Sequence, residues 1–129
     1  MELLIPVSPG ELLDKLTILE IKLERIDDEA KLANVRREHE FLSRIWDESG
    51  LDSEDVAAVR RRLRELNEAL WEIEDDIRVE EREKRFDGRF IELARSVYQR
   101  NDERAALKRQ VNELLGSEIV EEKSYSNYS

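Results

Sequence analysis

The scarcity of residues that end helices is the feature that most constrains how this chain folds. Its 129 residues include only 4 Gly and 2 Pro, while 42% are charged and 40% are hydrophobic. Gly and Pro destabilise helix interiors most, and Leu, Ile and Val recur here with a helical period. Such a composition is typical of long helices packed as a bundle or coiled coil. We therefore predict an all-α fold, an antiparallel bundle of about four helices, in a single domain over residues 1–129.

The clearest start of a helix lies near the N-terminus, although the stretch that follows is ambiguous by period alone. Residues 11–26, ELLDKLTILEIKLERI, alternate in part like a strand and also recur like a helix. Ser8 is suited to cap a helix, Pro9 to occupy its first position, and Glu11 to complete a capping box. This start signal predicts that the segment is a helix.

Two apolar faces run along this expected helix. One face carries the residues that recur at helical spacing, which are Leu12, Leu16, Leu19, Leu23 and Ile26. Ile18 and Ile21 lie on the far side, between Asp14 and Arg25. Because a helix with a second apolar patch usually packs against a second neighbour, we expect Ile18 and Ile21 to form an interface.

Two signals bound the second helix. Asp27 or Asp28 is expected to cap it, and the helix spans roughly residues 30–48. The loop that follows it, ESGLDSED at residues 48–55, is the clearest break in the helical pattern.

The third and fourth helices are the longest. Asp52 or Ser53 begins the third, which continues to about residue 85 with its Val, Leu and Ile in heptad register. A turn at residues 85–90 leads to the fourth helix, which continues to about residue 115 and ends at Gly116. We expect these two long helices to form a coiled-coil-like hairpin.

Charge and cysteine content narrow the class of partner. The chain has 22 basic and 32 acidic residues, a net charge of −10, and no cysteine. Its field repels nucleic acid, and we interpret the RRRLR run at residues 60–64 as a solvated helix face. Disulfides and thiolate metal sites are excluded. No apolar run approaches the roughly 18 residues of a membrane span, so we expect a cytoplasmic protein that binds neither membrane nor nucleic acid.

Polar residues interrupt the apolar face of the fourth expected helix. Arg104, Lys108 and Asn101 project from its middle, where a guanidinium is costly unless it is paired. The carboxylates expected to pair with Arg104 are Glu20, Glu74 and Glu81. The favoured interpretation is a salt-bridge network that fixes helix register, and the alternative is a pocket that binds a small anion. The ligand-binding candidates are Arg104, Lys108, Asn101, Glu74, Arg78 and Lys15.

Two sets of carboxylates have the spacing of a magnesium site. Glu11 and Asp14 form one set, and Glu74 and Asp75 belong to the other. All-helical nucleotide pyrophosphohydrolases use Glu-x-x-Asp spacing on facing helices to ligate magnesium, which prefers oxygen ligands. Such spacing is common in an acidic chain, and Glu11 is already accounted for by the cap. We therefore predict no metal and no cofactor, and keep these four residues as secondary candidates.

Four segments of the chain resemble a family of short bacterial proteins catalogued only as a domain of unknown function. They are VSPGELLDKLTILEIKLERI at 7–26, LWEIEDDIR at 70–78, FIELARSVYQRNDERAALKRQVNELLGS at 90–117 and EEKSY at 121–125. The resemblance covers nearly the whole chain. It implies no activity, so no catalytic residue follows from it.

A less specific resemblance is to the all-helical chorismate mutases, small dimers whose long helices line a pocket with Arg and Lys for dicarboxylates. It implies that Arg78, Arg104 and Lys108 take part in such a pocket. The arginine that this family places in its first helix has no clear equivalent here.

The sequence supports two hypotheses for function. The favoured one is a helical bundle that acts as an oligomerising or protein-interaction module. Its interface candidates are Ile18, Ile21, Tyr125 and Tyr128, the tyrosines belonging to a tail at 117–129 that we expect to be partly docked. The second hypothesis is a binding or enzyme site for a small anionic ligand between the helices, of the chorismate-mutase or the magnesium-dependent phosphohydrolase kind.

Overall fold

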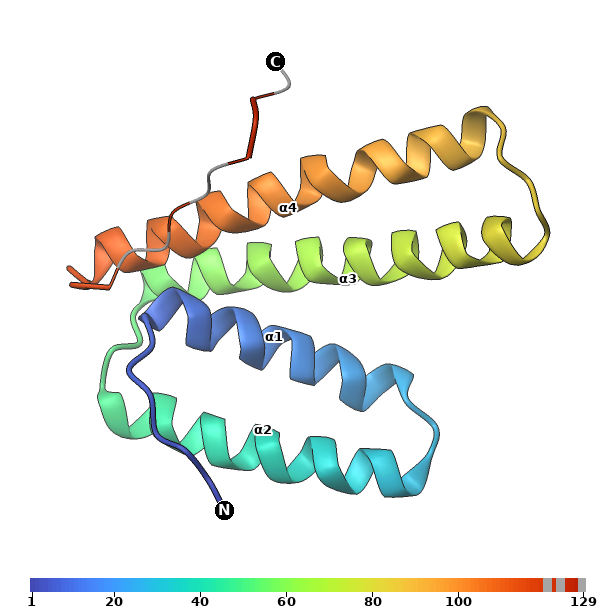
Figure 1. Ribbon diagram of the computed structural model, residues 1–129. Helices are drawn as coiled ribbons and strands as arrows, with labels where there is room; N and C mark the ends of the chain where they lie inside the picture. The colour runs from blue at the N-terminus through green and yellow to red at the C-terminus, as the bar shows by residue number, and fades with distance from the viewer. Residues whose placement is uncertain (120–121, 123–124, 128–129) are drawn as a thin grey trace.

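The computed structural model describes residues 1–119, 122 and 125–127 and consists of four α-helices (Figure 1). The helices are α1 (Pro9–Arg25), α2 (Glu29–Ser49), α3 (Glu54–Arg82) and α4 (Gly88–Leu114). The prediction of an all-α bundle is confirmed, and the described part of the chain contains no β-strand. None of these four helices is long and apolar enough to span a membrane.

Each helix begins at a Ser or Asp whose side chain accepts a hydrogen bond from the first turn. Ser8 accepts from the backbone N–H of Glu11 at 3.2 Å, as the capping-box signal predicts. Of the alternatives that the sequence leaves open, Asp28 caps α2 and Ser53 caps α3. The fourth helix, α4, is capped by Asp87. These caps satisfy N–H groups that have no partner within a helix, so they fix where each helix begins.

The end of α3 differs from the prediction, because the helix stops at Arg82 and not near residue 85. Lys84 has a φ of 58°, a left-handed conformation that ends a helix. The backbone N–H of Arg85 then donates to the carbonyl of Glu80 at 2.9 Å. The Arg85 guanidinium also donates to the Glu80 carboxylate at 2.9 and 3.1 Å, and this hydrogen bonding lowers the pKa of Glu80. The turn into α4 is thus closed by both backbone and side chain.

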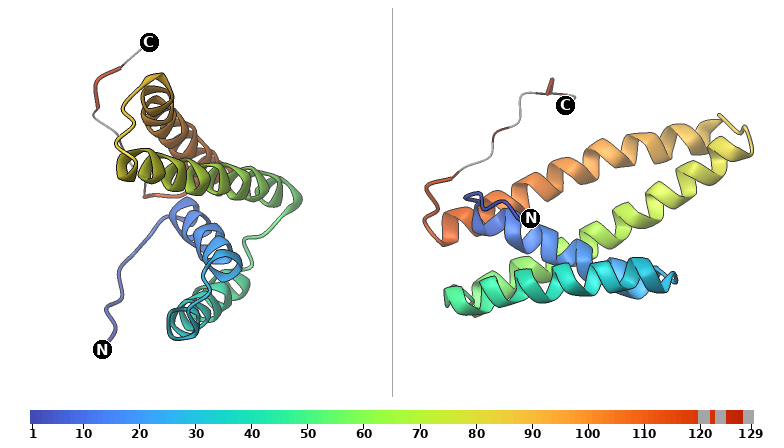
Figure 2. Two further views of the ribbon diagram at one scale, coloured as in Figure 1. Left: turned by 90° about the vertical axis from the view of Figure 1, so that its right-hand side faces the viewer. Right: turned by 60° about the horizontal axis from the view of Figure 1, so that its bottom comes forward.

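Two helical hairpins make up the fold, α1 with α2 and α3 with α4. In Figures 1 and 2, α1 lies between α2 on one side and the α3/α4 hairpin on the other. It packs against all three other helices. Since α1 has neighbours on several sides, Leu13, Leu16, Leu19 and Ile21 are each at most 1% exposed.

The burial of Ile21 corrects the argument for an interface on α1. Ile21 is 1% exposed within the chain itself, and Ile18 is half-buried. Both line a cleft whose other walls are α3 and α4. The second neighbour that the sequence predicts for this face is therefore the hairpin of the same chain, and Ile21 has no surface left for a partner.

The main hydrophobic cluster lies where α1 passes the first half of α3 and the last half of α4. Its buried members are Leu13, Leu16, Trp46, Val56, Val59, Leu63 and Val111. Leu12, Leu42, Leu107 and Leu115 pack around it. All four helices contribute to this one core, which holds the two hairpins together.

The other end of the α3/α4 hairpin continues past the ends of α1 and α2 (Figures 1 and 2). We call residues 73–100 the distal arm. The heptad residues Ile73 and Ile77 are only half-buried there, whereas Leu63 of the same series is fully buried. The arm is therefore a helical hairpin without the third layer that covers the rest of α3.

The tail after α4 is described in part. Gly116 has a φ of 62°, and the N–H of Ser117 donates to the carbonyl of Asn112 at 2.9 Å, so α4 ends where Gly116 predicts. Glu122 forms an ion pair with Arg109 of α4. The side chain of Tyr125 is largely exposed, and Tyr128 lies outside the described residues.

Candidate functional site

The N-terminus of α1 meets α4 at a very close approach. The N–H of Gly10 donates to Oδ1 of Asn112 at 2.8 Å. A Cβ atom at position 10 would lie 2.3 Å from the backbone oxygen of Lys108 and 2.9 Å from Oδ1 of Asn112. Because real Cβ atoms essentially never come that close to a backbone oxygen, only glycine fits where the two helices cross.

One turn further along α1, a buried carboxylate joins three helices. Asp14 is 1% exposed and accepts two hydrogen bonds from the guanidinium of Arg104, the one from Nε measuring 2.9 Å. Nδ2 of Asn67 on α3 donates to Oδ1 of Asp14 and to Oγ1 of Thr17, both at 2.9 Å. Thr17 in turn donates to the carbonyl of Asp14 at 2.7 Å. This bidentate pair and its amide are the paired, hydrogen-bonded form in which a charge can be buried.

We call this group of six residues the junction: Gly10, Asp14, Thr17, Asn67, Arg104 and Asn112. The sequence correctly predicts that Arg104 pairs with a carboxylate, but the partner is Asp14 and not Glu20, Glu74 or Glu81. Asp14 shares its helix face with Ile18 and Ile21, at spacings of four and seven residues. The position of a carboxylate on this second apolar face is the sequence signal that could have identified Asp14 as the partner of Arg104.

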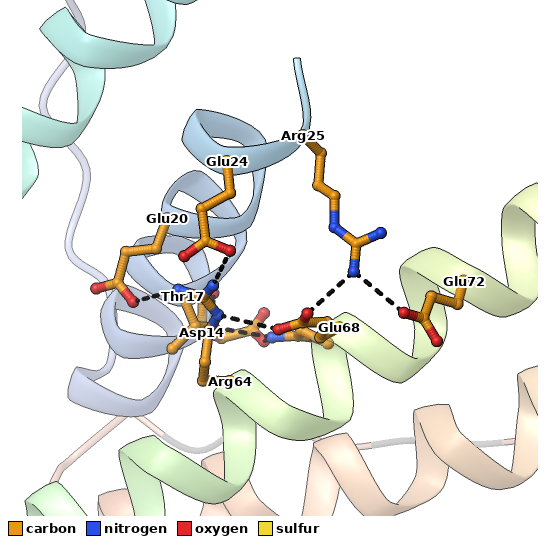
Figure 3. A network of polar contacts seen from close by, with 9 residues as sticks. Asp14, Thr17, Glu20, Glu24, Arg25, Arg64, Glu68 and Glu72 are labelled. Atoms are coloured by element: carbon orange, nitrogen blue, oxygen red, sulfur yellow. Dashed lines mark hydrogen bonds and ion pairs between the residues drawn. The ribbon is translucent and has the colours of Figure 1, made fainter. Parts of the chain in front are cut away.

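Further ion pairs fasten α1 to its neighbours. Lys108 donates to Glu11 at 2.6 Å, with the lysine side chain 13% exposed. Figure 3 shows the contacts along α1 and α3, where Arg64 joins Glu20 and Glu24, and Arg25 joins Glu68 and Glu72. These carboxylates and guanidiniums are partly exposed, so each pair contributes modestly.

Two of these arginines have shifted pKa values. Hydrogen bonds to Glu72 and then Glu68 raise the pKa of Arg25. For Arg64, desolvation by burial lowers the pKa, but hydrogen bonds to Glu24 and Glu20 more than offset it, so the pKa is raised. Both groups therefore stay charged at any physiological pH and act as fixed links between α1 and α3.

A cleft opens beside the junction, between α1, α3 and α4. It encloses about 460 Å³, within the range of small-molecule sites. Its apolar residues are Ile18, Ile21, Leu70 and Trp71, and its polar residues are Asn67, Glu74, Asp75, Arg78, Asn101 and Arg104. All but Asn67 come from three of the segments that carry the family resemblance, which lie far apart in the sequence and converge here.

The cleft gathers four of the six ligand-binding candidates: Asn101, Arg104, Glu74 and Arg78. Lys15 instead lines a hollow of about 280 Å³ on the other side of the Asp14–Arg104 pair, beside Lys22. It forms an ion pair with Glu38 at 3.5 Å. Helical periodicity singles out neither Trp71 nor Asn67, because both occupy ordinary positions of a long heptad helix.

The magnesium hypothesis finds no support in the geometry. Asp14 and Glu11 are each bonded to a cation, Arg104 and Lys108. Glu74 and Asp75 line the cleft on α3. Among the described residues, no group of three or more His, Cys, Asp or Glu side chains is placed to hold a metal ion.

The fold and site define an all-helical protein of two hairpins. The buried polar residues of the junction hold the two hairpins together, and a cleft lies beside the junction. The chain belongs to the family described as "Family of unknown function (DUF6165)", whose model matches residues 3–128. The predicted resemblance is thereby confirmed at the level of the family. No curated protein and no solved structure has significant similarity to the chain.

Proposed function

We propose that the protein is a self-associating helical module in which the distal arms of two copies pack together. The observation that carries this proposal is the uncovered state of the arm. Its seam residues Ile73 and Ile77 are half-buried, in a two-helix hairpin that continues beyond α1 and α2. Isolated two-helix hairpins bury little apolar surface, and pairing two of them gives the four-helix arrangement that buries more.

This moves the expected interface from α1 to the arm. Ile21 is buried in the chain's own fold, and Ile18 is half-buried in the wall of the cleft, so this face of α1 is directed at α3 and α4 of the same chain. The arm presents Phe86, Ile91 and Tyr98, which are 55%, 56% and 41% exposed. Large apolar side chains gathered on one segment are typical of contact surfaces.

The charges of the two arm helices suit a second copy of this chain. From residue 70 to 82, α3 carries six carboxylates and two guanidiniums, whereas from 88 to 100 α4 carries three guanidiniums and one carboxylate. In a two-fold dimer the same surface serves both copies. When α3 of one copy lies beside α4 of the other, opposite charges face each other twice, which favours this pairing over α3 beside α3.

Light scattering or sedimentation over a wide range of concentration tests the proposal. We expect a mass of two 15.3 kDa chains at high concentration, and dissociation as salt is raised. The variant Ile91→Glu places a carboxylate against acidic α3 of the other copy and is expected to remain a single chain. The matched control is Ile45→Glu, at a residue 44% exposed on α2, which keeps the two-chain mass.

Two outcomes count against the proposal. One is a single-chain mass at every concentration of the unaltered protein. The other is equal dissociation of the Ile91→Glu and Ile45→Glu variants, which would place the contact elsewhere.

The alternative of a small-anion site has less support from the contacts. Arg104 and Lys108, its main cations, are already paired with Asp14 and Glu11. Arg78 lies beside Glu74 at 3.5 Å. An anion would have to displace these carboxylates, so we do not base an enzyme activity on them.

A further inference from the structure

The cleft between α1, α3 and α4 is not needed for self-association and raises a separate question. Its deepest polar group is Asn67, which is 5% exposed. Nδ2 of Asn67 donates to Asp14 and to Thr17, which uses both of its hydrogens and fixes how the amide is turned. Within the described part of the chain, no hydrogen bond reaches Oδ1 of Asn67. Because Asn67 lines the cleft, this carbonyl oxygen can accept a hydrogen bond from a bound ligand.

Other acceptors lie along the same cleft. Asp75 and Asn101 both line it, and in the described residues neither side chain has a hydrogen bond or an ion pair. Among the described residues, Glu74 has a single ion pair, the long contact of 3.5 Å to Arg78, whose side chain is 77% exposed. An exposed pair of this kind is weak and is easily replaced by a stronger one.

The cationic group at the inner end of the cleft is neutralised. Arg104 lines the cleft, but its guanidinium forms a bidentate pair with the buried carboxylate of Asp14. What the cleft offers a ligand is therefore a set of acceptors: Oδ1 of Asn67, the amide of Asn101, and the carboxylates of Glu74 and Asp75. Acceptors of this kind select a ligand that carries N–H donors and positive charge.

The apolar part of the cleft fits the body of such a ligand. Ile18 and Leu70 provide a surface for methylene groups, and Trp71 lines the same cleft. The face of an indole attracts an ammonium or guanidinium group. The net charge of −10 draws cations toward the protein over longer distances.

We propose that this cleft binds an organic cation with N–H donors on a short aliphatic body, either a free di- or polyamine or the basic side chain of a polypeptide. The ammonium or guanidinium group lies between Asp75, Glu74 and the Trp71 ring, and a donor at the inner end reaches Oδ1 of Asn67. Arg78 competes with the ligand for Glu74. The proposal goes beyond self-association and stands without it.

Isothermal titration calorimetry with 1,5-diaminopentane and spermidine tests the free-amine source, and a lysine-containing peptide tests the polypeptide source. Saturable binding of at least one of the three probes is expected. The double variant Glu74→Gln/Asp75→Asn should weaken it about tenfold, and Trp71→Leu should weaken it about fivefold while keeping the wall apolar. Circular dichroism confirms that each variant keeps its helices.

A matched control separates this site from the general attraction of an acidic protein for cations. Glu40→Gln/Asp47→Asn removes the same two charges from exposed positions on α2 and should leave the affinity within about twofold. Arg78→Ala, which removes the competitor, should strengthen binding. An anion site predicts the reverse, since it would lose a cation.

Three outcomes would overturn the proposal. They are the absence of saturable binding by all three probes, equal losses in the cleft variant and its control, and weaker binding by Arg78→Ala. Binding of the peptide alone would assign the site to a polypeptide side chain, and binding of the amines alone to a free metabolite.

Discussion

At the junction every polar side chain has a hydrogen-bond partner in another helix or turn, whereas in the distal arm the side chains between the two helices are only half-buried. Asp14, buried to 1% exposure, is bonded by Arg104 and Asn67, and Gly10 lets α1 touch the backbone of α4. In the arm, only Leu93 and Glu80 are buried. The same hairpin thus has a closely packed end that fixes the fold and an open end whose packing depends on what lies beside it.

The largest expected contrast comes from the same kind of truncation at the two ends. Leu63→Ala removes a side chain that is 0% exposed in the main core and should lower the free energy of unfolding by about 4 kcal/mol. Ile77→Ala, at a half-buried position of the arm, should lower it by about 1 kcal/mol. Urea unfolding followed by circular dichroism at low protein concentration measures both values.

Self-association predicts that the loss of stability in this pair of variants depends on protein concentration. As concentration rises, the loss at Ile77 should grow while the loss at Leu63 stays constant, because only the arm gains contacts from a second copy. If Ile77→Ala and Leu63→Ala lost the same free energy of unfolding at every concentration, the arm would be packed as tightly as the core.

The junction pair provides the next contrast. Asp14→Ala removes the buried carboxylate that pairs with Arg104, and should cost about 3 kcal/mol. The double variant Asp14→Leu/Arg104→Met replaces both partners with apolar side chains and should recover most of that loss. The matched arm variant Asp76→Ala removes an exposed pair with Arg89 at 3.5 Å and should cost less than about 0.5 kcal/mol. A loss as large at Asp76 as at Asp14 would contradict the distinction between the two ends.

The difference between the two ends also explains what the sequence predicts and what it leaves out. The four helices follow from local signals, such as the Ser8–Pro9 start, the Asp28 cap and the left-handed Gly116. The bonding of Arg104 to a carboxylate follows from the cost of burying a charge. Its partner does not, because helical period shows which residues share a face but not which faces meet.

Gly10 illustrates the same limit at a single position. In the sequence it reads as part of a helix start, and nothing near it marks contact with Asn112, which is 102 residues away. The cleft was partly predictable, since Arg104, Asn101, Glu74 and Arg78 are polar residues on apolar edges. Trp71 and Asn67 line the same cleft because of the angle at which α1 crosses α3. No local sequence pattern specifies that crossing angle.

The last contrast tests Gly10 against a glycine at the far end of the hairpin. A methyl group at Gly10 would lie 2.3 Å from the Lys108 carbonyl oxygen, so Gly10→Ala must push α1 away from α4 and weaken the bond to Asn112. We expect a loss of about 2 kcal/mol. Gly88, at the start of α4, has nothing within 4 Å of such a methyl group. There the same substitution raises helix propensity and should stabilise the protein by about 0.5 kcal/mol. Thermal and urea unfolding of the two variants measure whether each substitution raises or lowers the free energy of unfolding. Stabilisation by Gly10→Ala would show that the two helices are not in contact, because alanine is otherwise the better helix former.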